Sequence, residues 1–437
     1  MNSDAAQLIA DLNHHDAAVR LASLRRLMVK IANRELERPA GGKDVNNHIH
    51  TIFSFSPYSP AKAVWMAYNS GLATAGLMDH DSIAGAREFI EAGKIAGIAT
   101  TIGLECRVNF SKTPLQGRRI NNPDQDSIAY IAIHGIPHTQ IDKVSGFFQP
   151  LINCRNIRNR KMTHKLNEIF EPWGIKLDFA KDIIPVSQYP AGGTITERHI
   201  LYALSLKLIE HYPKGTALVS FLKEKLELKM GPKIEGYLTD SANPYYVYDL
   251  LGLLKAELTG SFYIDATSEC PDAGDVIRFA AEIGAITAYA YLGDVGDSVT
   301  GDKKAQKFED GYLDLLFEVL KDLKFNAITY MPSRNSMEQL ERIREKCVQY
   351  GFFQISGEDI NSPRQSFICQ ALRQEKFQNL FDAAWALIGH EIVATEQPGE
   401  GLFSASTIKQ YPQLEERIKL YREIGLSGKS PYLNTRG

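Results

Sequence analysis

The chain has 437 residues, of which 44% are hydrophobic and 23% charged, a composition typical of an ordered globular protein. A formal net charge of -3 gives no basic footprint for duplex nucleic acid, and five widely spaced cysteines without a C-x-x-C pair argue against a disulfide framework or a zinc knuckle. We find no signal peptide and no apolar run near the roughly 18 residues of a membrane span. We therefore expect a cytoplasmic protein with no membrane partner.

The first segment is predicted to be a helical arm. Apolar residues recur at helical spacing between Asp4 and Arg38, with a polar break at 13–16 that divides the segment into two helices. The Pro-Ala-Gly-Gly stretch at 39–42 is typical of a linker.

The next predicted strand carries a pair of histidines, His48 and His50, around which we expect the functional site. Side chains alternate along a strand, so two imidazoles separated by one residue face the same side. That geometry suits two ligands on one metal ion. The pattern by itself also fits two ordinary strand histidines.

From residue 45 onward, short apolar runs alternate with helical stretches, which predicts an α/β domain with a mainly parallel sheet. One buried run ends in Asp79-His80-Asp81 and the following run ends in Glu105. The carboxyl ends of such strands are where sites are built. A carboxylate there can bridge two cations while imidazoles fill the other positions, which makes His80 and Glu105 candidate ligands.

A fourth apolar run, at 128–136, places Tyr130 and His134 on one face by alternation. The chain then becomes mostly helical for more than a hundred residues, and we interpret this stretch as an insertion.

Within the insertion, Thr194 and Glu197 are spaced as in a capping box at a helix start. Arg198 and His199, beside the same helix N-terminus, would also suit a phosphate group. The residues alone leave both interpretations open.

Three further runs, beginning at 285, 325 and 352, bring the candidate strands to seven, which is enough to close a barrel. The last run is followed by Asp359-Ile360-Asn361, again polar residues after a strand. The expected organisation is an arm at 1–42, barrel parts at 43–150 and 276–372, the helical insertion at 151–275, and a helical C-terminal extension at 373–437.

These motifs together resemble the polymerase and histidinol phosphatase (PHP) family of metal-dependent phosphoesterases. The resemblance rests on H-x-H-T, Asp-His-Asp, Gly-x-Glu and a C-terminal Gly-x-Asp in the family's order, over about 45–136 and 285–369. The insertion resembles that of the subgroup that acts on nucleotide phosphates and RNA 5′ ends. The resemblance implies a distorted seven-stranded (β/α)7 barrel, with divalent cations at the carboxyl ends of its strands.

The resemblance also implies a ligand set for one to two ions of manganese, zinc, magnesium or iron. His48, His50, Glu105 and Asp359 would hold the first ion, with Glu105 bridging to a second. The ligand after Glu105 would be His134, or Tyr130 if the strand is aligned differently. The full set of candidate ligands is His48, His50, His80, Glu105, His134, Asp359 and Asn361.

Three positions depart from the family pattern. Phe55 stands near the family's aspartate of the first motif, and Asn361 replaces the histidine of its last motif. Both would belong to a third metal site with His80, so we expect that site to be weak or absent. Tyr291 replaces a histidine of the second site, and a phenol of pKa about 10 is an uncommon ligand at neutral pH.

Two acids close to Tyr291, Asp294 and Asp297, are alternative oxygen ligands or members of a solvated loop. We expect Tyr291 to contact the substrate together with Arg198 and His199.

The implied reaction is hydrolysis of a phosphate ester of a small metabolite or nucleotide by metal-activated water. His80 is a candidate general acid, and Asp81 beside it is the second catalytic candidate. A small phosphorylated molecule is the expected partner, and a nucleotide or an RNA end is compatible with the resemblance. The substituted ligands favour an alternative, a PHP-derived binding or regulatory protein with a degenerate metal site and little catalysis.

Overall fold

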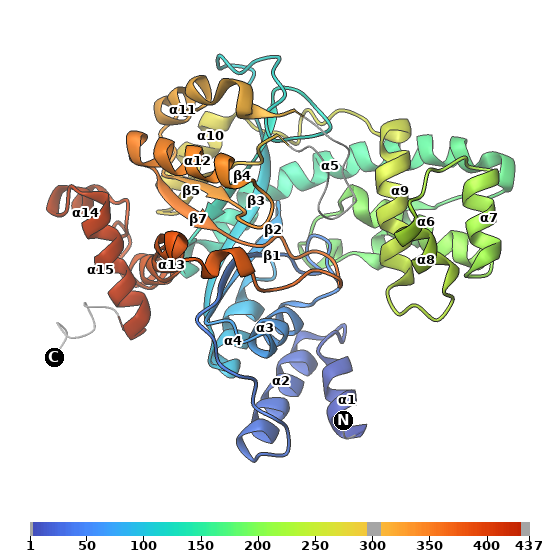
Figure 1. The fold of residues 1–437 in the computed structure, drawn as a ribbon, viewed down its shortest axis with the longest axis horizontal. Coiled ribbons are helices and arrows are strands. Elements are labelled where there is room, and N and C mark those ends of the chain that lie inside the picture. The colour runs from blue at the N-terminus through green and yellow to red at the C-terminus, as the bar shows by residue number, and fades with distance from the viewer. Residues whose placement is uncertain (1–2, 295–306, 430–437) are drawn as a thin grey trace.

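The sheet at the centre of the molecule contains all seven predicted strands. The computed structural model describes residues 3–294 and 307–429, and within them the strands form one sheet in chain order (Figure 1). The strands are β1 (Val45–Ile49), β2 (Thr74–His80), β3 (Ala99–Asn109), β4 (Ile128–His134), β5 (Ile286–Ala290), β6 (Ala327–Tyr330) and β7 (Phe353–Ser356).

The strand directions depart from a regular β/α repeat at one place. β4 runs antiparallel to both of its neighbours, whereas the other neighbouring strands are parallel. Residues 110–127 join β3 to β4 without a crossover helix, and only a parallel pair requires such a crossover. The sheet is therefore mixed, and the repeat that we expected is interrupted at β4.

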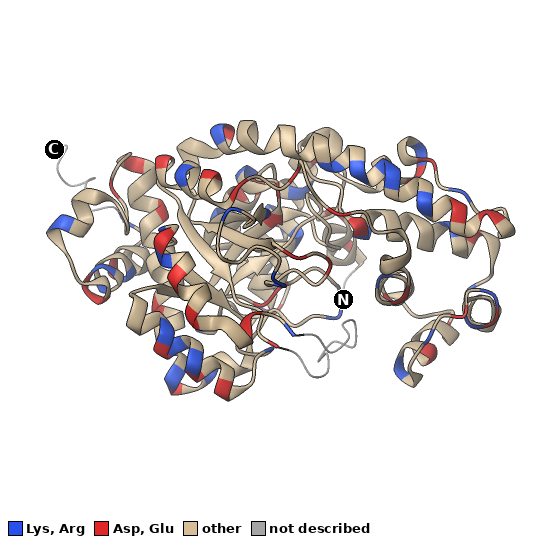
Figure 2. Cartoon of the chain, turned by 90° about the horizontal axis from the view of Figure 1, so that it is seen from above, with Lys and Arg blue, Asp and Glu red and all other residues tan. Residues whose placement is uncertain are grey.

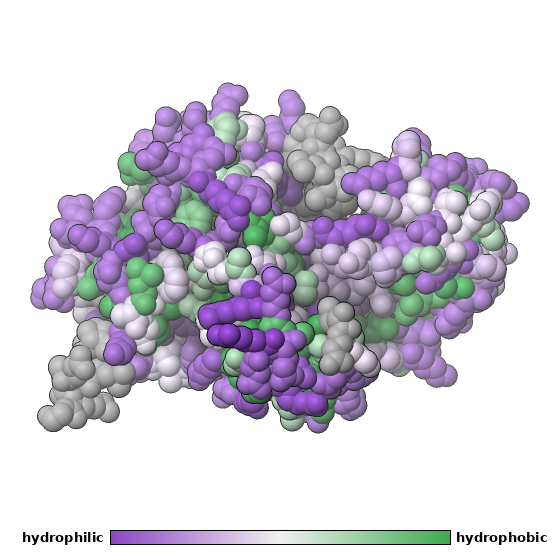
Figure 3. Space-filling model, turned by 60° about the horizontal axis from the view of Figure 1, so that its bottom comes forward, coloured by the Kyte–Doolittle hydropathy of each residue, from purple (hydrophilic) through white to green (hydrophobic). Residues whose placement is uncertain are grey.

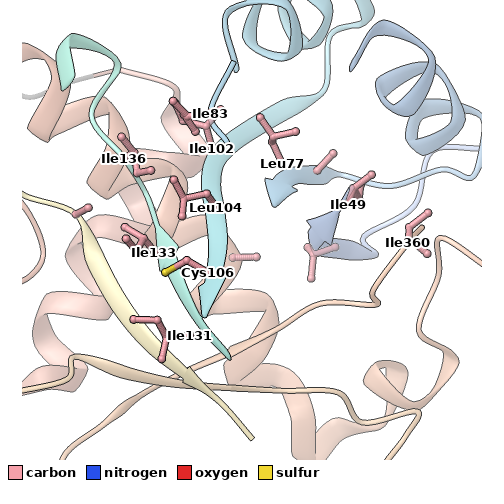
Figure 4. Close-up of a cluster of buried hydrophobic side chains, with 14 of the residues drawn as sticks. Ile49, Leu77, Ile83, Ile102, Leu104, Cys106, Ile131, Ile133, Ile136 and Ile360 are labelled. Atoms are coloured by element: carbon pink, nitrogen blue, oxygen red, sulfur yellow. The ribbon is translucent and has the colours of Figure 1, made fainter. Parts of the chain in front are cut away.

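The sheet curls until its first and last strands come together. Ile360, after β7, donates its N–H to the His48 carbonyl at 3.1 Å, and its carbonyl accepts the His50 N–H at 3.0 Å. Ile49 and Ile360 accordingly lie near each other in Figure 4. These contacts bring the residues after β7 beside the histidine pair of β1.

Apolar layers cover both faces of the sheet, because side chains alternate along each strand. On the outer face, Leu77 and Leu104 belong to a core that packs beneath the crossover helices (Figure 4). On the inner face, Met78 and Ile286 pack against Leu387 of α13 (Gln378–Glu396). The crossover helices are α3 (Pro60–Asn69), α4 (Ala86–Ala96), α11 (Leu313–Asp322) and α12 (Met337–Tyr350).

The N-terminal arm packs on α3 and α4, as Figure 1 shows at the bottom of the view. It consists of α1 (Ser3–Asp11) and α2 (Ala17–Ala32). Arg20 of α2 forms a buried ion pair with Glu88 of α4, in which Nε donates to Oε1 at 2.8 Å. At the other end of the chain, α15 (Leu414–Ser427) packs along α13, and α14 (Ala405–Gln410) precedes it.

The helical insertion lies to one side of the sheet, on the right in Figure 1, and has an apolar core of its own. That core runs from Met162 to Phe262 and includes one barrel residue, Phe55. The helices of this region are α5 (Ile141–Phe170), α6 (Glu197–His211), α7 (Thr216–Glu224), α8 (Pro232–Thr239) and α9 (Tyr246–Phe262), and α10 (Ala273–Glu282) leads back to β5.

The surface carries charges of both signs. Figure 2 shows Lys and Arg interspersed with Asp and Glu over the helices around the sheet. On the face shown in Figure 3, hydrophobic patches are small and separated by hydrophilic residues. Among the described residues, the helices are too short or too polar to cross a bilayer.

Candidate metal and phosphate site

A cavity of about 660 Å³ lies between the rim of the sheet and α9 of the insertion. The sheet contributes polar side chains from the ends of β1 and β2, from β3 and from the segment after β7. Arg198 of α6 lines the same cavity. The rim residues facing the cavity include His48, His80, Glu105, Asp359 and Asn361.

The donor atoms of five of the seven predicted ligands lie close together. His50 Nε2 lies 3.2 Å from Asp359 Oδ1 and 4.0 Å from Glu105 Oε2. The same Glu105 oxygen lies 3.7 Å from His48 Nε2 and 3.2 Å from His80 Nδ1. They form two overlapping groups, His48 with His50 and Asp359, and His50 with His80 and Glu105, each with donor atoms within 4.8 Å of one another.

The electrostatics of this cluster attract positive charge. Burial opposes the ionisation of Glu105, yet the imidazoles of His80, His48 and His50 hold the pKa of its carboxyl at about 2. Burial likewise opposes the charge on Asp359, but His50 and His48 keep its pKa well below the usual range. Two ionised carboxylates therefore lie beside the same imidazoles, an arrangement that attracts a cation.

Two imidazole nitrogens at the site lack hydrogen-bond partners. His48 Nε2 and His134 Nε2 are buried and have none among the described residues. Burying such a group without a partner costs about 1–3 kcal/mol. Burial lowers the pKa of His134 to about 3, so its ring is neutral. Bare nitrogens beside carboxylate oxygens fit a divalent ion such as zinc, manganese or iron.

His134 lies deeper in the sheet than the other candidate ligands. On β4 it is Ala132 that pairs with Glu105, so His134 is two residues farther down the strand. Tyr130 lies at the opposite end of β4 and lines the cavity, with its ring 5.9 Å from that of His80. Both residues face inward, as alternation predicts.

The three substituted positions make contacts of other kinds. The Tyr291 hydroxyl donates to Asp310 Oδ1 at 2.5 Å, and burial raises the pKa of this phenol. The Asn361 amide donates to Asp359 Oδ1 at 2.6 Å. The Phe55 ring packs edge-on against the His199 ring, with 5.0 Å between centroids. These contacts stabilise the rim and orient Asp359.

Tyr291 points away from the metal ligands because of its place in the strand pattern. With Tyr289 it belongs to the outer apolar core, although part of it still lines the cavity. Asp294, the first proposed substitute ligand, accepts the Phe308 N–H at 2.6 Å, so one of its carboxylate oxygens is already engaged. Asp297 lies outside the described residues.

Asp81 and the start of α6 differ in detail from the sequence interpretation. Asp81 is buried in an ion pair with Arg155, whose Nη1 lies 2.5 Å from Asp81 Oδ2. The capping residue of α6 is Thr196, whose N–H donates to His199 Nδ1 at 3.0 Å. Thus Thr196 and His199 form the capping box that we assigned to Thr194 and Glu197.

Of the two proposed phosphate contacts, the structure places Arg198 at the cavity. Arg198 and Asp359 line the same cavity, and the charge of Arg198 contributes to the lowered pKa of Asp359. His199 is 1% exposed, and burial lowers its pKa to about 3, so its ring is neutral and packed beneath the helix start.

The sequence analysis did not predict a buried network of ion pairs that lies behind the site. Arg155 and Arg158, on one face of α5, bind Glu197 at 2.8 Å and 2.6 Å. Arg107 of β3 lies 3.3 Å from Glu269, which also pairs with Arg158. The spacing of Arg155 and Arg158 signals a shared helix face, but the sequence does not show that this face is buried. The network fixes the insertion, and hence Arg198, relative to the rim.

No protein-family model matches the chain, and no curated protein matches it. Its fold is known, however. A Bifidobacterium adolescentis protein named as a candidate metal-dependent phosphoesterase matches 79% of this chain and 98% of its own length, at 18% identity and a TM-score of 0.50. An amidohydrolase from Chromobacterium violaceum, with bound sulfate and no metal, matches 77% of this chain and 95% of its own, at 15% identity and a TM-score of 0.49. At this identity the first likeness establishes a shared fold.

Proposed function

We propose that the chain is a PHP-type metal-dependent phosphoesterase that hydrolyses a phosphate ester of a small metabolite or nucleotide. The observation that carries the proposal is the grouping of five ionisable side chains at the rim of the sheet, one of which, His48, has a buried ring nitrogen without a hydrogen-bond partner among the described residues. The same rim opens into a cavity that a cationic side chain, Arg198, lines from the opposite side.

Different residues would bind the ion and the phosphate. His48, His50, Glu105 and Asp359 would hold the first divalent ion, which when bound lowers the pKa of water and stabilises charge on phosphoryl oxygens. Arg198 would bind the phosphate, because a planar guanidinium donates two parallel hydrogen bonds to it.

The charge state of His80 favours a ligand or hydrogen-bonding role over that of general acid. Burial lowers its pKa to about 3, despite the carboxylate of Glu105 at 3.2 Å. A neutral imidazole can hold a metal ion or accept a proton, but it has no extra proton to give. Asp81 supports the site indirectly, since its carboxylate is held by Arg155.

The donor set supports one tightly held ion and a weaker second one. Glu105 lies between His48 and His80 and can bridge two ions. A second ion would draw on His80 or His134, because the Tyr291 hydroxyl is bound to Asp310.

A binding or regulatory protein is the second candidate function. It is favoured by the same three substitutions, since Phe55, Tyr291 and Asn361 make structural contacts where the family has ligands. Such a protein would keep the cavity and Arg198 but turn over slowly or not at all.

Elemental analysis of protein purified without chelator, paired with hydrolysis of p-nitrophenyl phosphate under added manganese, magnesium or zinc, tests the proposal. The native chain is expected to hold one or two ions and to release phosphate. His48→Ala/His50→Ala is expected to lose both properties. A matched control, His164→Ala/His211→Ala, removes two exposed imidazoles of the insertion and is expected to keep them.

The outcomes separate the two functions. Metal in the native chain without turnover of any phosphate ester would favour the binding protein. A native chain that binds no ion, or a double variant that keeps its metal, would overturn the metal site itself.

A further inference from the structure

Asp79 lies directly behind the candidate metal site. It precedes His80 on β2, so alternation directs its side chain to the other face of the strand. The carboxylate is fully buried and accepts three hydrogen bonds from the loop after β1. Oδ1 accepts the Thr51 N–H at 2.6 Å and the Ser54 hydroxyl at 2.7 Å, and Oδ2 accepts the Thr51 hydroxyl at 2.6 Å.

These contacts determine the direction of the Ser54 hydroxyl. Burial raises the pKa of Asp79, whereas the hydrogen bonds from Thr51 and Ser54 favour its ionised form. An ionised carboxylate has acceptors only, so the Ser54 hydroxyl then gives its single proton to Oδ1. Ser54 Oγ can then only accept from its other neighbour, His50 Nδ1, at 3.2 Å.

The direction of this hydrogen bond fixes the tautomer of His50. Its ring carries a proton on Nδ1, and Nε2 is left as a bare lone pair unless the ring is charged. Nε2 faces Asp359 Oδ1 at 3.2 Å and Glu105 Oε2 at 4.0 Å. A lone pair opposite two carboxylate oxygens is repelled by them, and a positive charge between them, either a divalent cation or a proton on Nε2, removes the repulsion.

We propose that Asp79 is a positioning residue that acts through Ser54, fixing His50 in the Nδ1–H tautomer and presenting Nε2 to a divalent cation. The cation rests on the proposed function, whereas the tautomer rests on the hydrogen bonds and on an ionised Asp79. A hydrogen-bonded partner on the second nitrogen commonly fixes the orientation of a metal-binding histidine. Here the partner reaches the ring through a serine hydroxyl.

The tautomer can be measured without metal or turnover. Two-bond proton–nitrogen spectra of chelator-treated protein labelled with ¹⁵N-histidine, recorded at pH 8, distinguish a proton on Nδ1 from one on Nε2. The His50 signals are assigned by their loss in His50→Gln. The native chain is expected to show Nδ1–H at His50.

Two variants interrupt the relay, which is the hydrogen-bonded chain from Asp79 through Ser54 to His50, at different points. Ser54→Ala removes the connecting hydroxyl but leaves both Thr51 contacts to Asp79, and Asp79→Ala removes the acceptor. Both are expected to shift His50 toward the Nε2–H tautomer and to weaken metal binding by about 10- to 100-fold. If Asp79→Ala fails to fold, Ser54→Ala carries the test.

Ser59→Ala is the matched control. It also removes a fully buried serine hydroxyl, which caps α3 by accepting the Lys62 N–H at 3.0 Å. It is expected to change neither the His50 tautomer nor metal affinity.

Three outcomes would overturn the relay: a native His50 with its proton on Nε2, an imidazolium at pH 8, or an unchanged tautomer in Ser54→Ala. A native chain that shows Nδ1–H yet binds no manganese or zinc would uphold the relay and overturn the proposed function. The two proposals therefore fail separately.

Discussion

Two glutamates on opposite sides of the rim, Glu105 and Glu309, show how partners decide the charge of a buried carboxyl. Burial disfavours the charged form of both. Three imidazoles nevertheless hold the pKa of Glu105 at about 2. At Glu309, burial raises the pKa to about 7, because its hydrogen bonds from backbone N–H groups only partly compensate and the neighbouring Asp310 repels its charge.

The comparison extends to the whole rim. On the side of β1 to β3, nitrogen and oxygen atoms stay available to the cavity. On the side of β5, polar groups pair with one another, as Tyr291 does with Asp310. The polar groups on the β5 side therefore stabilise the rim, whereas those on the side of β1 to β3 are available to bind an ion or a substrate.

The largest expected effect is on the side that keeps its donors available. Arg198→Ala should lower kcat/KM for a phosphate ester about 10²- to 10³-fold, because a cation aimed at the phosphoryl oxygens is lost. Metal content should stay unchanged. Arg198→Lys should recover only part of the loss, since it lacks the planar pair of donors.

Steady-state kinetics check this prediction, with Arg160→Ala as the control because Arg160 is an exposed arginine of α5. Less than a threefold change in Arg198→Ala would mean that the cavity is not the reaction site.

A smaller effect is expected in stability against pH. Glu309 has a folded pKa of about 7, raised from an ordinary value of 4.5, so the folded state binds more protons between these pH values. The stability that protonated Glu309 contributes is present below about pH 4.5 and is lost as pH rises through 7. At ~1.4 kcal/mol per pKa unit, the loss is about 3 kcal/mol.

Glu309→Gln should remove this pH dependence, because glutamine stays neutral. Urea unfolding at pH 5 and pH 8 measures it, with the exposed Glu341→Gln as the control. If the unfolding free energy changed equally between pH 5 and pH 8 in native protein and in Glu309→Gln, Glu309 would be ionised throughout this range.

The smallest effect is expected at Tyr291. Tyr291→Phe should leave metal affinity within about twofold of the native value and cost about 1–2 kcal/mol of stability, from the lost hydrogen bond to a charged group. Calorimetric metal titration and urea unfolding check both values.

Tyr330→Phe is the control for Tyr291→Phe, since it also lines the cavity and donates to Gln354 at 2.9 Å. If Tyr291→Phe lost an ion and Tyr330→Phe did not, the Tyr291 phenol would be a metal ligand. The proposed difference between the two sides of the rim would then be wrong.

The sequence predicted the features that depend on periodicity. All seven strands were found from apolar runs, and the inward direction of His48, His50 and His80 followed from alternation and from their place at strand ends. Because parallel strands end on one rim, residues far apart in sequence could be expected to meet.

Features set by loops and by contacts between segments could not be predicted in this way. The direction of β4 depends on the loop at 110–127, which has no period. Asp79 was visible only as a neighbour of His80, because its partners Thr51 and Ser54 lie in a turn. The hydrogen bond of Tyr291 to Asp310 joins two segments that no periodicity relates.

The packing of α13 on the inner face of the sheet has a consequence for synthesis. Met78 and Ile286 leave the ribosome long before the helix that covers them, which begins only at Gln378. Until then the inner face has no apolar partner from this helix, and a nascent chain exposing such a face is prone to aggregate. The helix that covers the inner face thus emerges after all seven strands, and a chain truncated before Gln378 would have that face uncovered.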